Sequence, residues 1–161
     1  MRPWRSVWPI RLAGIVLLAG CGTTLAAPST FGSVVGSAVL CLDHLDNAYF
    51  YAYLSASFGP PYKQEGGAWW FKADANLWGI AISEVLVGDD SSPTSFIAAV
   101  ADAPPDKLEA AIGAARGLHH GVVDASAFPL RRSAAGSKIV YFNDKSKIYC
   151  DSYQPPAPGP R

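Results

Sequence analysis

Residues 68–90 read AWWFKADANLWGIAISEVLVGDD and carry two runs of strand-forming residues around a short turn. In the first run, apolar and polar side chains alternate between Trp69 and Asp74, which is the period of a half-buried strand. The second run, IAISEVLV, is rich in β-branched residues, and Asn76 and Gly79 bracket the expected turn. This stretch predicts an antiparallel hairpin, around which the rest of the chain is interpreted.

Two further segments resemble strands. Residues 95–102, SFIAAVAD, form a short apolar run after the turn-forming sequence DDSSP, and they predict a third strand. Residues 138–153, KIVYFNDKSKIYCDSY, contain two alternating runs on either side of NDKS. This pattern predicts a second hairpin that closes the domain.

Two segments predict helices. Residues 40–61, LCLDHLDNAYFYAYLSASFGPP, have apolar side chains at three- and four-residue spacing and predict one helix that ends at Gly59. Residues 103–117, APPDKLEAAIGAARG, have prolines at the start, Asp106 in the first turn and Gly117 as the C-terminal cap. The narrow apolar stripe of this helix could dock into a partner protein, but packing on its own sheet is the preferred interpretation.

These elements together predict the α+β class. The expected architecture is an antiparallel sheet of about five strands built from hairpins, with two helices packed on one face. We place this single domain at residues 39–153, after a flexible tether over residues 21–38. Residues 154–161 are rich in proline and are expected to form a disordered tail.

The first 20 residues have the character of an export signal. Arg2, Arg5 and Arg11 precede the apolar run LAGIVLLAG, and no acidic residue occurs in this segment. The run is shorter than the roughly 20 apolar residues that a bilayer-spanning helix needs. A basic segment followed by a short apolar one is typical of a secretory signal peptide.

The end of this leader, residues 18–21 with the sequence LAGC, resembles the lipobox of bacterial lipoproteins. The resemblance covers the leader alone, and it implies cleavage before Cys21 and a lipid anchor on its sulfur. In that family an acidic residue after the cysteine favours the inner membrane, so Gly22 favours the outer membrane. The alternative is an ordinary signal peptide cleaved after Ala26 or Ala27, where small residues also occur at a suitable spacing.

Composition restricts the partners. Without residues 1–20, the chain retains ten basic and 13 acidic residues, a formal net charge of minus three. This balance argues against nucleic acid, whose binding requires a basic patch. The expected partners are therefore the membrane, through the lipid on Cys21, and an envelope protein or a small ligand.

Two cysteines, Cys41 and Cys150, remain in the expected domain. In the oxidising compartment that an export signal implies, such a pair is typically bridged. We predict a disulfide that ties the first element to the last. Neither cysteine lies in the sequence context of a known nucleophile motif, which argues against a catalytic cysteine.

The aromatic segment FGPPYKQEGGAWWF, residues 58–71, is the strongest candidate for a contact with a ligand or partner. Tyr62, Trp69 and Trp70 are large amphipathic rings of the kind enriched at binding surfaces. The preferred interpretation is that these rings complete the core, and a contact with a ligand or partner is the alternative. Because adjacent residues of a strand point to opposite faces, the two tryptophans cannot both be buried in the same layer.

The chain shows no catalytic signature of the G-x-S-x-G or S-x-x-K type and no phosphate-binding loop. His44, His119 and His120 lack the spacing of a metal site, so neither a metal nor a cofactor is expected. The preferred function is a non-catalytic binding or interaction protein of the envelope. The alternative is an envelope hydrolase that uses His119 or His120 with a nearby carboxylate.

Overall fold

The strands on either side of the turn near Gly79 belong to one antiparallel sheet of eight strands in the computed structural model of the chain, which describes residues 26–153. The order across the sheet is β1-β2-β3-β4-β8-β7-β6-β5. The strands are β1 Lys63–Glu65, β2 Ala68–Leu77, β3 Ile80–Gly88, β4 Thr94–Ala101, β5 His120–Val122, β6 Arg131–Ser133, β7 Lys138–Phe142 and β8 Lys145–Tyr153. The α+β class and the antiparallel sheet are confirmed.

Both predicted hairpins are present. In the β2–β3 turn, Trp78 and Gly79 have φ angles of 55° and 81°, and the N–H of Gly79 donates to the side-chain oxygen of Asn76 at 2.9 Å. Positive φ at both central residues is the geometry that favours the right-handed twist of paired strands. In the β7–β8 turn, Asn143 has a φ angle of 56°.

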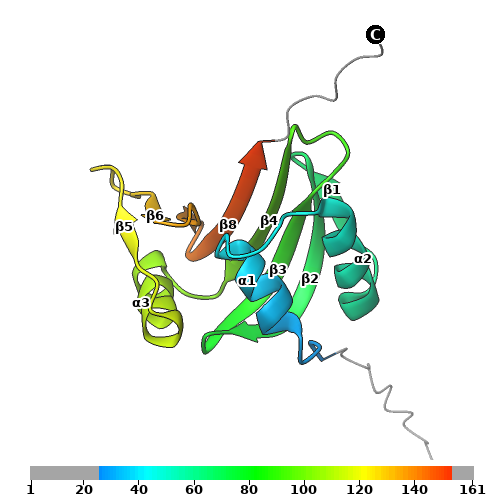
Figure 1. Ribbon diagram of the computed structural model, residues 1–161, viewed down its shortest axis with the longest axis horizontal. Helices are drawn as coiled ribbons and strands as arrows, with labels where there is room; N and C mark the ends of the chain where they lie inside the picture. Colours follow the sequence, from blue (N-terminus) through cyan, green and yellow to red (C-terminus); the bar gives the residue numbers. More distant parts are fainter. Residues whose placement is uncertain (1–25, 154–161) are drawn as a thin grey trace, which may run out of the picture.

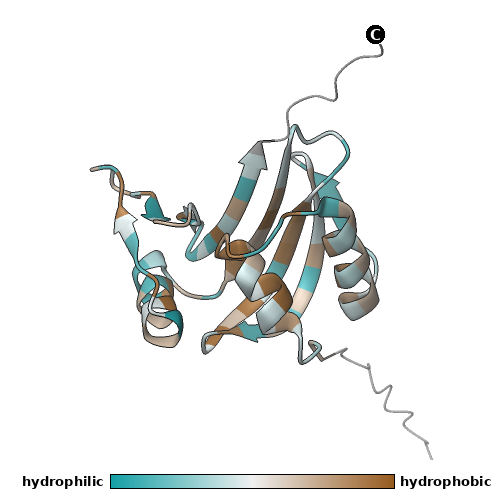
Figure 2. Cartoon of the chain, viewed as in Figure 1, coloured by the Kyte–Doolittle hydropathy of each residue, from teal (hydrophilic) through white to brown (hydrophobic). Residues whose placement is uncertain are grey.

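The helices pack on one face of this sheet (Figure 1). They are α1 Ser37–Val39, which continues the π-helical turn η1 Gly32–Gly36, and the longer helices α2 Asn47–Phe58 and α3 Pro105–Arg116. Val35, Leu54 and Leu108, one from each helical region, belong to the same buried cluster as the inward side chains of the strands. Figure 2 shows the hydrophobic central strands behind α1.

The expected tether is shorter than the sequence suggested. Residues 31–38 were expected to be flexible, but Phe31, Val35 and Ala38 are buried in the core. Glycine and serine residues between them make the segment resemble a linker in sequence. The apolar side chains nevertheless share one side of the helical turns and are buried where these turns pack on the sheet. The folded domain therefore begins before residue 39.

The expected helix over residues 40–61 is also corrected. The regular helix α2 starts at Asn47, because Asp46 has an extended backbone and accepts a hydrogen bond from the N–H of Tyr49 at 3.1 Å. This is an N-terminal cap, which satisfies a helix donor that would otherwise be free. Between the two helices, Cys41 adopts a φ of 58°, which is incompatible with a continuous right-handed helix.

The element counts differ from the expected five strands and two helices. The sheet has eight strands, and the additional strands β1, β5 and β6 contain three residues each. A run of three residues is too short to show an alternating pattern, so pairing with longer neighbours creates these strands. The extra helix is the short α1.

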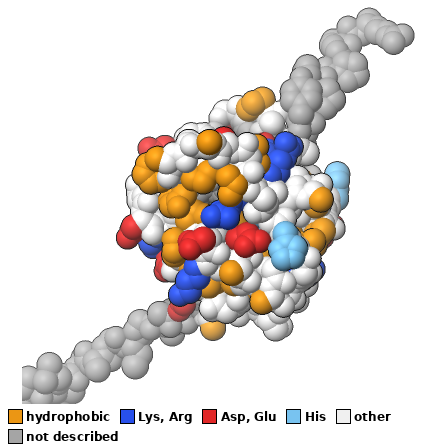
Figure 3. All heavy atoms as spheres, turned by 90° about the vertical axis from the view of Figure 1, so that its left-hand side faces the viewer, with side chains coloured by type: hydrophobic (Ala, Val, Ile, Leu, Met, Phe, Trp, Pro, Cys, Tyr) orange, Lys and Arg blue, Asp and Glu red, His pale blue; other side chains and the backbone are white. Residues whose placement is uncertain are grey.

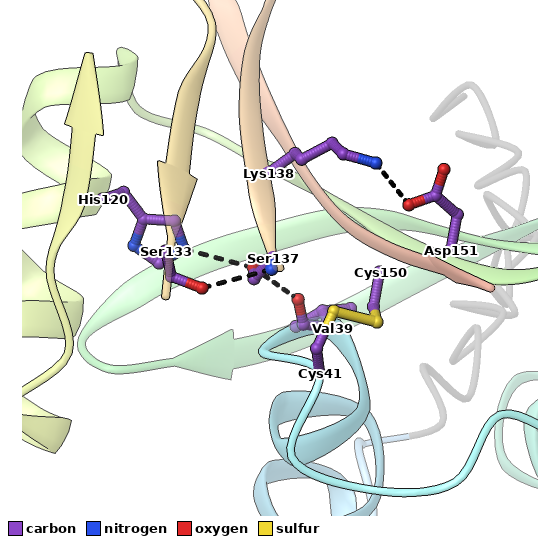
Figure 4. The surroundings of a disulfide bond; sticks show 8 residues. All are labelled: Val39, Cys41, His120, Ser133, Ser137, Lys138, Cys150 and Asp151. Carbon is purple, nitrogen blue, oxygen red and sulfur yellow. Dashed lines mark hydrogen bonds and ion pairs between the residues drawn. A yellow bond between two sulfur atoms is a disulfide. The ribbon is translucent and has the colours of Figure 1, made fainter. Parts of the chain in front are cut away.

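The predicted disulfide between Cys41 and Cys150 is confirmed. It joins the segment after α1 to β8 across 109 positions of sequence. Figure 4 shows the bond beside the carbonyl of Val39, where the N-terminal helical region contacts the sheet. The leader, Cys21 and the tail at 154–161 lie outside the described residues. No helix within residues 26–153 is long and apolar enough to cross a membrane.

Candidate functional site

The sheet has a second face, on which no described helix packs. Trp70, Leu86 and Ala98 lie side by side across β2, β3 and β4 on this face, and Tyr149 of β8 is opposite Ala98. These residues belong to a small cluster separate from the main core. We call this side of the molecule the open face.

The open face is hollowed. The hollow has a volume of about 570 Å³, within the range of small-molecule sites, which are roughly 300–1,000 Å³. Ala98, which is small, lies between the larger Leu86 and Tyr149 and leaves room above the sheet. The full lining is Glu65, Gly66, Ala68, Trp70, Leu86, Thr94, Phe96, Ala98, Val140, Lys147, Tyr149 and Asp151.

Lysine ammonium groups lie over aromatic rings at and beside this hollow. The ammonium of Lys147 lies 4.2 Å from the ring centre of Phe142 and 5.1 Å from that of Trp70. Lys63 lies 3.9 Å from the ring centre of Trp70. Such distances allow a cation–π attraction, which holds the lysine chains against the rings.

Four lysines of the open face form ion pairs with carboxylates. Lys63 pairs with Glu65 at 2.9 Å and Lys145 with Asp102 at 2.6 Å. The remaining two pairs are Lys72 with Glu84 and Lys138 with Asp151.

Lys147 differs from these lysines, because it forms no ion pair with any residue of the described chain 26–153. It is half-buried, and this burial lowers the pKa of its ammonium group. The carboxylate of Glu84 opposes this shift, whereas the positive charge of Lys63 adds to it. The hollow thus contains a cation that has lost hydration and contacts aromatic rings, but that has no carboxylate partner in the described chain.

Tyr62, Glu84 and Lys72 form a hydrogen-bonded group on the open face near β1. The hydroxyl of Tyr62 donates to Glu84 at 2.7 Å, and Lys72 binds the same carboxylate oxygen. Burial raises the pKa of Tyr62, and its hydrogen bond to Glu84 adds to the shift. For Glu84, burial alone would raise the pKa, but the hydrogen bonds from Lys72 and Tyr62 outweigh it and the pKa is lowered.

The structure separates the three aromatic residues singled out in the sequence. Trp70 lies in the hollow, and Tyr62 stands beside it, with its N–H bonded to the carbonyl of Trp70 at 2.9 Å. Trp69 points to the other face, where its ring contacts Tyr51 of α2 with a centroid distance of 5.6 Å. The expectation that the two tryptophans face opposite ways is confirmed.

Sequence reasoning missed the contribution of β7 and β8 to the hollow. Val140, Lys147 and Tyr149 are far from Trp70 in sequence and line the same hollow because β8 pairs with β4 and β7 pairs with β8. A signal was present in the alternation of residues 145–151, KSKIYCD, which places lysine, tyrosine and aspartate on one side of the strand. The alternation did not show which strands would pair with this one and bring their side chains next to the lysine and the tyrosine.

The histidines do not converge on a common site. The side chain of His119 is 81% exposed, and its Nδ1 lies 3.4 Å from a carboxylate oxygen of Glu109. His120 is buried and bonded to Ser137 (Figure 4). Within residues 26–153 there is no group of three or more His, Cys, Asp or Glu side chains that could hold a metal ion.

Exposed hydrophobic residues occur on a second part of the surface. Val122 ends β5, Val123 and Phe128 follow it, and the ring of Phe128 contacts that of Tyr141 with a centroid distance of 5.0 Å. Figure 3 faces the side of the molecule that carries β5 and β6, and hydrophobic side chains gather there next to basic and acidic ones. These four residues do not line the hollow of the open face.

No protein-family model, curated protein or solved structure shows significant similarity to this chain. The chain therefore has an antiparallel sheet that is covered by helices on one face and carries an aromatic hollow on the other. Its lining provides apolar walls, aromatic rings and Lys147, which forms no ion pair with another described residue. This arrangement is suited to binding.

Proposed function

We propose that this protein is a lipid-anchored bacterial envelope protein that acts by binding a ligand or partner on its open face. The observation that carries the binding role is the hollow around Trp70 and Tyr149, an aromatic surface that no helix of the described chain covers. The lipobox at residues 18–21 supports the address. The disulfide supports it further, because such bonds persist in oxidising compartments.

The hydrolase alternative has less support. It needs a histidine and a carboxylate together in a cleft, but the contact between His119 and Glu109 is on the surface. His120 is buried in a hydrogen-bond network with Ser137, where a substrate does not reach its ring. We therefore favour a non-catalytic role.

One experiment in living cells tests both parts of the proposal. The full chain is produced with a photoreactive phenylalanine analogue in place of Tyr149, in cells fed an alkyne-labelled palmitate. We expect the palmitate label on the mature protein in the outer-membrane fraction, and its loss in the Cys21→Ser variant. A mature chain that starts after Ala26 or Ala27, without label, would overturn the anchor.

Irradiation of the same cells tests the binding role. We expect a crosslinked product from position 149 and none from the analogue in place of Tyr49, an exposed ring of α2 on the helical side. Both positions replace one aromatic ring with another of similar size. Equal yields at the two positions, or no product at position 149, would contradict binding on the open face.

A further inference from the structure

We infer that the hollow of the open face binds an amphiphile that carries a single negative charge, with its anionic headgroup at Lys147 and its apolar body over Ala98 and Leu86. This inference rests on the proposed function, because it names the ligand class of the same site. It predicts a preference among small molecules that differ in their headgroup alone.

The charge of the site supports a single anionic group. Two lining carboxylates, Glu65 and Asp151, are already paired with lysines. Lys147 has no carboxylate partner in the described chain, so one positive charge remains at the hollow. A charge in partly buried surroundings is stabilised when an opposite charge pairs with it, and a hydrogen bond to a charged group is stronger than a neutral one.

The walls of the site support an apolar body. Leu86 and Ala98 form the centre of the hollow, with Trp70 on one side and Tyr149 on the other. Leu86 is 3% and Ala98 is 2% exposed, so these two residues form the floor of the hollow, and the partly exposed side chains of Phe96, Val140 and Tyr149 complete its apolar lining. Burial of apolar ligand surface is favourable by about 25 cal/mol per Å².

The position of Lys147 relative to these walls sets the orientation. It lies on β8, two positions from Tyr149, and is opposite Val100 of β4 and Val140 of β7. Its ammonium group is held against Phe142 and Trp70 at the edge of the apolar surface. A headgroup bonded there leaves the chain of the ligand free to extend along the hollow.

The test is isothermal titration calorimetry on the full chain carrying Cys21→Ser, with octanoate as the probe. Octanol and octyltrimethylammonium have the same chain with a neutral and a positive headgroup, and acetate has the headgroup without the chain. We expect octanoate to bind with one site and at least about tenfold more tightly than octanol and octyltrimethylammonium, which cannot form a charged hydrogen bond with Lys147. It should also bind at least about tenfold more tightly than acetate, which lacks the apolar chain. Equal affinity for octanol would overturn the inference.

Two variants test the headgroup contact and the apolar hollow separately. Lys147→Gln should lower the affinity for octanoate about tenfold and remove the preference over octanol, whereas Lys107→Gln, an exposed lysine of α3, should change neither. Ala98→Leu should weaken octanoate and octanol together, because the larger side chain occupies the hollow. Circular dichroism confirms that each variant is folded.

The outcomes distinguish this inference from the proposed function. If Lys147→Gln keeps the preference for octanoate, Lys147 does not hold the headgroup, and if octanoate does not bind at all, an anionic amphiphile is not the ligand; either result overturns the inference. A crosslink from position 149 in cells would then still support a binding role on the open face. If that crosslink is absent as well, the proposed function fails independently.

Discussion

His120 shows how one buried side chain makes stability depend on pH. The hydroxyl of Ser137 donates to the carbonyl of Val39 at 2.7 Å, so it accepts from Nε2–H of His120 at 3.1 Å. The other ring nitrogen, Nδ1, is buried and has no partner in the described chain. A second proton would create a buried charge and an unpaired donor, which is costly.

We therefore predict that acidification destabilises the protein through His120. Burial lowers the pKa of His120; Glu109 opposes this shift and His119 adds to it. The unfolded state, with a pKa near 6.5, binds the proton more readily than the folded state. The free energy of unfolding should be constant above about pH 6.5 and fall as the pH decreases toward the folded pKa. Urea denaturation at pH 7.5 and 5.5 measures this difference.

Two variants assign the effect. His120→Gln should flatten the dependence between these pH values. His119→Gln should reduce it only slightly, because burial lowers the pKa of His120 more than the neighbouring His119 does. Carboxylates with lowered pKa values, such as Asp102 and Asp124, contribute in a separate, more acidic range. An unaltered pH dependence in His120→Gln would contradict the assignment.

At the scale of elements, the start of α2 is held to the end of two strands. Asn47, the first residue of α2, accepts a hydrogen bond from the N–H of Phe96 in β4 at 3.1 Å. Gly88 at the end of β3 allows this approach, because a Cβ there would lie 2.6 Å from the side-chain nitrogen of Asn47 and 3.1 Å from the carbonyl of Thr94. The absence of a side chain at position 88 therefore sets how closely helix and sheet meet.

We predict that Gly88→Ala destabilises the protein by about 1–3 kcal/mol, the usual cost of forcing atoms into a packed region. The matched control is Gly121→Ala in β5, where no atom lies within 4 Å of the added Cβ. The control should change the free energy of unfolding by less than about 0.5 kcal/mol. Urea denaturation of both variants measures the difference, and equal effects would contradict the role of Gly88.

Local sequence patterns predicted the elements correctly where the contacts that form them are local. The β2–β3 and β7–β8 hairpins follow from alternation around a turn, and α3 follows from its apolar stripe and its caps. The start of α2 was misjudged, because the apolar spacing continues through residues 41–45 although the backbone does not remain helical.

At the scale of the whole molecule, the disulfide connects the two ends of the fold. It closes a loop between Cys41 and Cys150, 109 positions apart. In the unfolded chain, closing a loop of this length removes conformational entropy worth about 4–5 kcal/mol. The bridge is thus expected to be a large part of a net stability that is about 5–15 kcal/mol for an ordinary domain.

We predict that the double variant Cys41→Ala and Cys150→Ala loses about 4 kcal/mol of unfolding free energy. A reductant should lower the denaturation midpoint of the wild-type protein and have no effect on the variant. Chemical denaturation with and without dithiothreitol measures both. A wild-type midpoint that does not respond to complete reduction would contradict a stabilising role for the bond.

The candidate site could be predicted in part. Trp70 was recognisable as a ring facing away from Trp69, since alternation along one strand is a local property. Lys147 was not recognisable, because its lack of a carboxylate partner depends on which side chains the neighbouring strands bring to it. Exposure and ion pairing are properties of the packed surface, which no single segment contains.

The amino-acid order alone predicted the strands of the two hairpins, the helix α3, and the pairing of the two cysteines that remain in the domain. These features follow from periodicity, turn chemistry and composition, which act between near neighbours or on residue type. The pairing of β4 with β8, the helices on a single face, and the hollow around Lys147 emerge from the tertiary structure. They depend on contacts between distant segments, whose free energy exists only after the chain has folded.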